Sequence, residues 1–219
     1  MNKKRLTVAA SLVLAIALVI VGTTMTYLTS RTEPKVNNFG VGTLTTDIHE
    51  NDQSTPESVN SIPINFTDKA PKQVAVENAA GKDAIDAYVR VQLVPSFRDT
   101  NGVNLGGDFA MAEPSDNKIV FTPFTDKDLT ITLAFDDHWS GSWFYVADDN
   151  CFYYKTIVAP GHRTDVLLEE VQFSGADAAG WKDKFNLDVL TDSIQAGGRA
   201  ASDAWTNINI TEDSQLARH

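Results

Sequence analysis

Apolar and polar positions alternate with a period of two along most of the chain after residue 63. In 72–78, for example, Val74 and Val76 share one face of an extended chain. The segments with this pattern are 72–78, 85–95, 118–124, 128–135, 143–157, 164–173 and 184–196. Only 197–205 has a helical composition, and no segment sustains a 3.6-residue apolar period. The pattern therefore predicts β-strands throughout.

Together with a first strand before residue 51, these segments make about nine strands. We expect an all-β fold, an antiparallel β-sandwich that is jelly-roll-like, with an immunoglobulin-like topology as the alternative. The residues expected to face its interior are Val74, Val76, Ala87, Val89, Val91, Leu93, Leu129, Ile131, Leu133, Phe135, Phe185, Leu187 and Val189.

Local signals set the expected boundaries of these strands. The first strand is expected from Asn38 to Glu50, with a bulge at Gly42 because the apolar parity shifts there. Residues 51–63 are polar and are expected to form a loop. Pro95 is expected to end its strand, since proline donates no ladder hydrogen bond. Asp148–Asn150 are turn formers and predict a hairpin inside 143–157.

The first 26 residues have the composition of a secretory signal peptide. Lys3, Lys4 and Arg5 precede an uncharged run from Leu6 to Val21. A helix of that length spans about 24 Å, less than the ~30 Å hydrocarbon core of a membrane. We expect cleavage between Thr26 and Tyr27, with retention as a membrane anchor as the alternative.

The chain thus divides into a signal peptide (1–26), a tether or donor strand (27–37) and a β-sandwich domain (38–219). Cleavage would remove three of 18 basic residues and none of 29 acidic ones, changing the formal net charge from −11 to −14. A chain this acidic is a poor partner for nucleic acids and anionic lipid surfaces. Cys151 is the only cysteine, so no internal disulfide can form.

Four stretches occur in a recognisable order along the chain. They are TYLTSRTEPKVNNFGVGTLTTDIHE, KQVAVENAAGKDAIDAYVRVQLVP, FYYKTIVAPGHRTDVLLEEVQF and VLTDSIQAGGRAASDAW. In this order, following a signal peptide, they resemble the TasA/camelysin-type family of exported bacterial surface and biofilm-matrix proteins. The resemblance extends from about Ile20 to Trp205.

The resemblance implies a secreted protein of the cell surface or extracellular matrix. It also implies a signal peptidase of the SipW kind, and self-association into fibres in which the N-terminal segment of one subunit completes the sheet of the next. Pro34 would interrupt a long donor strand, which shortens it to six residues. The expected donor residues are Tyr27, Leu28, Thr29, Ser30, Arg31 and Thr32. A disordered leader before an ordinary first strand remains open, as do a matrix protein or polysaccharide partner and a monomeric adhesion module.

The camelysin branch of the family also implies a cell-surface metallopeptidase, but the sequence lacks the H-E-x-x-H zinc motif. The histidines are His49, His138, His162 and His219, all far apart in sequence. No G-x-S-x-G motif surrounds Ser140 or Ser142. We therefore expect no enzyme activity, no cofactor and no catalytic metal.

Two features allow a second interpretation. Acidic turns such as the one that begins at Asp99 could bind calcium, although turn formation alone explains their composition. The densest aromatic group could be a glycan platform, but we expect it to form core. Its members are Trp139, Trp143, Phe144, Tyr145, Phe152, Tyr153 and Tyr154, with Cys151 as a buried, inert thiol among them.

Overall fold

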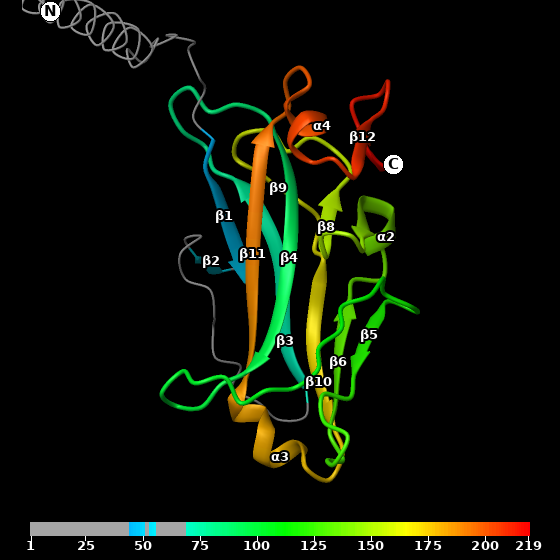
Figure 1. Cartoon of the computed structure of the whole chain (residues 1–219). Coiled ribbons are helices and arrows are strands. Elements are labelled where there is room, and N and C mark those ends of the chain that lie inside the picture. The colour runs from blue at the N-terminus through cyan, green and yellow to red at the C-terminus, as the bar shows by residue number, and fades with distance from the viewer. Residues whose placement is uncertain (1–43, 51–52, 56–68) are drawn as a thin grey trace, which may run out of the picture. The chain divides into compact units, whose positions relative to one another are not determined.

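Two antiparallel sheets pack face to face, as the alternating pattern predicts (Figure 1). The computed structural model describes residues 44–50, 53–55 and 69–219. All of them belong to one compact unit, Gly42–His219. The predicted antiparallel β-sandwich is confirmed. No helix in the described ranges has the length and apolar character needed to cross a membrane.

The larger sheet contains, in spatial order, β2 (Gln53–Thr55), β1 (Thr46–Glu50), β3 (Lys69–Asn78), β10 (Leu168–Ser174), β6 (Thr130–Phe135) and β5 (Lys118–Phe121), with β9 (His162–Arg163) also paired to β3. The smaller sheet contains β11 (Phe185–Gln195), β4 (Ala87–Phe97), β8 (Cys151–Tyr154) and β7 (Trp143–Val146). Near the C-terminus, β12 (Ile208–Ile210) pairs with β13 (Leu216–Arg218). The short helices are α2 (Trp139–Ser142), α3 (Ala178–Trp181), the 3₁₀ turn η1 (Lys182–Lys184) and α4 (Ala200–Ala204).

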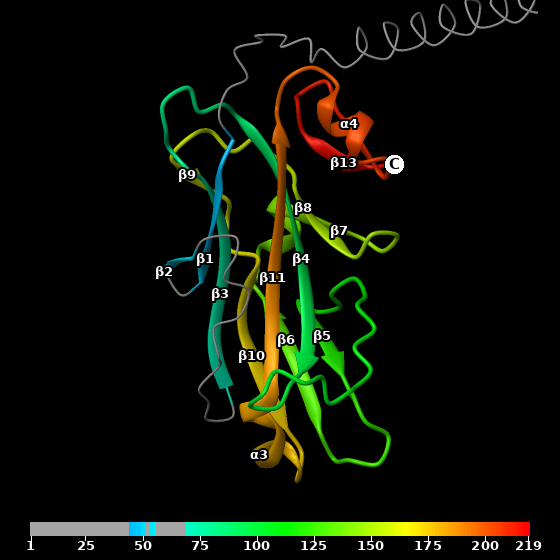
Figure 2. The same cartoon turned by 60° about the vertical axis from the view of Figure 1, so that its left-hand side comes forward.

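The chain repeatedly changes sheet, between β3 and β4, β4 and β5, β6 and β7, β8 and β9, and β10 and β11. Such connections are typical of Greek-key sandwiches, the group to which jelly rolls belong. Figure 2 shows the longest pair, β4 and β11, running side by side over their whole length.

The expected interior faces are confirmed. Every residue predicted to face the interior is at most 2% exposed, and all of them except Ala87 belong to the main core between the two sheets. The aromatic group is buried as well, so its interpretation as core is confirmed and the exposed glycan platform is wrong. Phe144 and Tyr153 belong to a second apolar cluster, separate from the main core.

Pro95 does not end β4, contrary to expectation, because it lies where only one side of the strand is paired. It is in register with Leu187 of β11, and β4 continues to Phe97. On the other side, β8 pairs only with Arg90 and Val91. A proline is tolerated at such an edge, where no neighbour needs its missing N–H group.

Two N-terminal expectations also change. Among the described residues, which start at 44 in this region, the first strand begins at Thr46. The expected bulge at Gly42 lies outside the described residues. Within the expected loop 51–63, Gln53–Thr55 form β2 and pair with β1. The hairpin at 143–157 is confirmed as β7 and β8, and Asn150 has a φ of 55° in its turn.

Truncation of Leu133, which is fully buried on β6, tests the core. Leu133→Ala should lower the free energy of unfolding by about 2–5 kcal/mol, through lost burial and a residual cavity. Val120→Ala on neighbouring β5 is the matched control because Val120 is 58% exposed, and should change stability by less than about 0.5 kcal/mol. Denaturant unfolding measures both, and equal effects would contradict the assignment of faces.

Candidate functional site

The predicted cleavage site and donor strand, Thr26 to Thr32, lie outside the described residues. The described residues can instead show where the sandwich could accept an added strand. An edge strand offers a row of N–H and C=O groups to which an extended peptide can bind.

The longest edge strand is β11. It pairs with β4 over 11 consecutive residues without a slip, and no described strand lies on its other side. The other outer strands, β2, β5 and β7, have three or four residues each. β11 contains no proline and no bulge, the two features that commonly block an edge.

Hydrogen bonds at both ends of the β4–β11 ladder show which backbone groups of β11 point outward. The Arg98 N–H donates to the Lys184 carbonyl at 2.7 Å, and the Ala196 N–H donates to the Asp86 carbonyl at 2.8 Å. In an antiparallel ladder the bonded pairs alternate. Even-numbered residues of β11 therefore bond to β4, and odd-numbered residues direct their N–H and C=O groups outward. The outward set is Phe185, Leu187, Val189, Thr191, Ser193 and Gln195.

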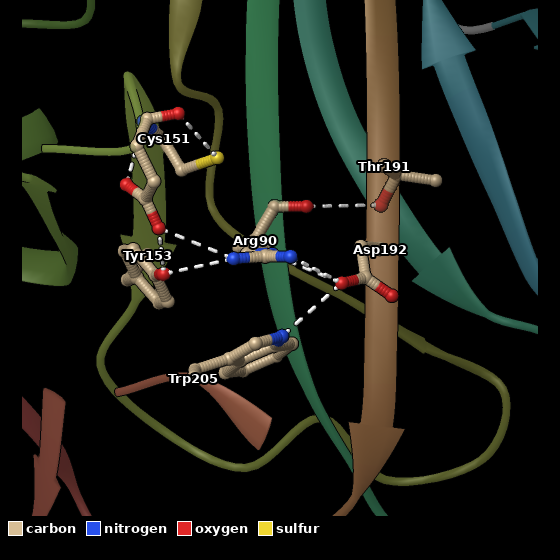
Figure 3. Close-up of polar contacts among 7 residues, drawn as sticks. Arg90, Cys151, Tyr153, Thr191, Asp192 and Trp205 are labelled. Atoms are coloured by element: carbon tan, nitrogen blue, oxygen red, sulfur yellow. Dashed lines mark hydrogen bonds and ion pairs between the residues drawn. The ribbon is translucent and has the colours of Figure 1, made fainter. Parts of the chain in front are cut away.

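The outer face of the smaller sheet carries a polar cluster around Arg90 (Figure 3). Arg90 lies directly opposite Asp192 on one side and Tyr153 on the other, so the three side chains share a face. Its guanidinium contacts Asp192 at 2.8 Å, Asp149 at 3.2 Å and the Tyr153 hydroxyl at 3.1 Å. It also lies 5.1 Å from the ring of Trp205, whose indole N–H donates to Asp192 at 3.1 Å.

The C-terminal segment covers this face of the sheet. Its apolar side chains, Ala201, Trp205, Ile208 and Leu216, pack in one buried cluster with Tyr88 and Tyr153 of the sheet. The Tyr88 hydroxyl donates to the Ser214 carbonyl at 2.9 Å, and the Leu216 N–H donates to the Lys155 carbonyl at 2.7 Å. The smaller sheet is thus covered on its outer face here, and among the described strands only β4 pairs with β11.

Cys151 lies within the covered cluster and is 7% exposed. Burial, followed by the negative charge of Asp149, raises the pKa of its thiol to about 11. Burial and a hydrogen bond to Asp149 likewise raise the pKa of Tyr153. The thiol is therefore protonated at neutral pH, and the expectation of a buried thiol is confirmed.

Nothing in the described ranges assembles a metal centre. No three His, Cys, Asp or Glu side chains gather there in a way that could hold a metal ion. His49 contacts Glu77 at 2.9 Å, whereas His138 is exposed beside Asp136. The Asp99 carboxylate accepts N–H hydrogen bonds from Asn101 and Val103, both at 2.8 Å, so it stabilises its own turn.

Sequence reasoning missed the Arg90 cluster and the C-terminal cover. Period-two alternation places Tyr88, Arg90 and Gln92 on the face opposite the core but indicates no partner for them. The signal that could have found the cover is the apolar residues Trp205, Ile208 and Leu216, which follow the last long strand and need a surface on which to pack.

Comparison with protein-family models, with curated proteins and with solved structures finds no match to this chain. The function proposed below therefore depends on the geometry of the sandwich and on the sequence resemblance.

The reactivity of Cys151 tests the C-terminal cover. Trp205→Ala should weaken the packing of the cover on the sheet by about 3 kcal/mol. Because each 1.4 kcal/mol changes the equilibrium between closed and open cover about tenfold, Cys151 should react with a thiol reagent about a hundredfold faster. In the parent protein the rate should rise about tenfold per pH unit between about pH 7 and pH 10, because the thiolate is the reactive form.

Asp203→Ala is the matched control because Asp203 is an exposed residue of α4. This variant should react with the thiol reagent at the parent rate. Fast labelling of the parent protein at neutral pH would contradict the closed cover.

Proposed function

We propose that this chain is an exported, non-enzymatic structural protein of the bacterial cell surface or biofilm matrix whose copies join into fibres by strand addition. The observation that carries the proposal is the free edge of β11, which is 11 residues long and paired only with β4 among the described strands. Export and the surface location are supported by the N-terminal pattern and by the family resemblance.

In the proposed assembly, residues 27–32 of one copy pair with β11 of the next. Six extended residues span about 20 Å and the 11 residues of β11 about 36 Å, so the edge has room for the donor. The outward N–H and C=O groups of β11 would form the new ladder. Because donor and acceptor are different surfaces, each copy can bind one neighbour at each end, which gives an open filament.

Signal-peptide cleavage acts as the switch in this scheme. Before cleavage the donor is joined to an apolar segment held at the membrane, and after cleavage Tyr27 becomes a free N-terminus that can reach another copy. The mature chain has a formal net charge of −14, so copies repel one another at low ionic strength. Salt should therefore promote assembly by screening this repulsion.

The donor is tested with two N-terminal forms of the mature protein. The form that begins at Tyr27 should make filaments visible by electron microscopy, and the form that begins at Phe39 should stay monomeric by light scattering. Filaments from both forms would remove the donor role of 27–32. Monomers from both would leave the monomeric adhesion module as the better function.

The acceptor is tested at Ser193, whose N–H points away from β4. In the Tyr27 form, Ser193→Pro removes one outward N–H donor without removing a β4–β11 hydrogen bond. The lost hydrogen bond to the added strand and the steric clash of the proline ring cost about 1.4 kcal/mol or more. Filament formation should therefore fall at least about tenfold. Ser193→Ala retains the N–H and should assemble normally. If Ser193→Pro is folded and assembles as well as Ser193→Ala, β11 is not the acceptor.

A further inference from the structure

A lysine points into the sandwich where an apolar residue is expected. Lys72 of β3 has the same parity as the buried residues Ala70 and Val74, and only 2% of its surface is exposed. Beside it lies Glu50, the last residue of β1, which is 4% exposed. β1 and β3 are adjacent strands, with Glu50 in register with Val74.

The two side chains are in direct contact. Nζ of Lys72 lies 2.5 Å from Oε2 of Glu50. Neither atom makes a hydrogen bond of ordinary geometry with any part of the chain that the structure describes. A buried ion pair whose two contacting atoms lack further hydrogen bonds is costly, because desolvation of each ion takes several kcal/mol. Transfer of one proton from the ammonium to the carboxylate removes both charges.

A second buried carboxylate acts on the pair only through its charge, because it has the parity of Asp192 on β11 and so lies on the outer face of the smaller sheet. Asp188 of β11 is 8% exposed, and its Oδ2 accepts a hydrogen bond from Arg98 at 2.6 Å. Its Oδ1 has no hydrogen-bond partner among the described residues. Burial lowers the pKa of Lys72, although the charges of Glu50 and Asp188 act in the opposite direction. A neutral lysine amine is a nucleophile.

We propose that Lys72 and Glu50 condense into an intramolecular amide, an isopeptide bond between β3 and β1. The ammonium first gives one proton to the Glu50 carboxylate. The neutral Nζ then attacks Cδ of Glu50, the Nζ–Cδ bond forms, and one Cδ–O bond breaks. A second Nζ proton passes to the leaving hydroxyl, which departs as water. The charges of the ion pair cancel and no oxidant or co-reactant is needed.

Such a bond would give this chain an internal covalent cross-link. A disulfide cannot do so, because the chain has a single cysteine. The bond does not depend on the proposed function. If fibres do form through residues 27–32, tension would enter the sandwich at β1, the first described strand after that segment. The bond would then carry the tension directly to β3, in the middle of the larger sheet.

Mass spectrometry of the denatured monomer tests the bond without reference to assembly. The measured mass of the parent protein should be lower than the mass calculated from its sequence by the mass of one water molecule. Trypsin should yield peptide 36–69, which contains Glu50, joined to peptide 70–82, which contains an uncleaved Lys72. A parent protein of full sequence mass that is cleaved after Lys72 would overturn the proposal.

Matched variants locate the reacting groups. Lys72→Arg keeps the positive charge but should have the full sequence mass, whereas Lys69→Arg, at an exposed position of the same strand, should keep the mass deficit. Loss of water in Lys72→Arg overturns the bond.

Discussion

The antiparallel ladder between β4 and β11 is the constraint on which the other features depend. Its pairs follow one another without a slip. The register that buries Leu187 and Val189 also places Asp192 opposite Arg90 and turns the odd-numbered backbone groups of β11 outward. A shift of one residue would exchange the faces of every side chain on β11. The same pairing therefore determines the core, the polar cluster and the free edge.

The smaller sheet is covered on its inner face and on part of its outer face, and its longest edge strand among the described residues is β11. Its inner face packs on the larger sheet, and the cluster of Trp205, Ile208 and Leu216 lies against its outer face. The edge of β11 offers backbone pairing as the contact between copies in the proposed assembly. The net charge of −11 opposes non-specific association, which favours a directional contact.

The sequence predicted the fold class and the interior faces well because period-two alternation reports directly on burial. It predicted features that depend on neighbouring strands poorly. Pro95 is tolerated only because β8 stops short of it, and Arg90 is held by residues far along the chain. Lys72 has the parity of Val74, but a lone lysine near a strand end normally indicates solvent. Its partner Glu50 comes from β1, which no local pattern connects to it.

Amide hydrogen exchange along β11 tests the free edge most directly. In the monomer, the N–H groups of even-numbered residues such as Leu190 and Asp192 should be protected by β4, while those of odd-numbered residues such as Thr191 and Ser193 should exchange rapidly. In filaments the odd-numbered residues should become protected as well. Equal protection of odd and even residues in the monomer would show that the edge is already occupied, and would contradict assembly by strand addition at β11.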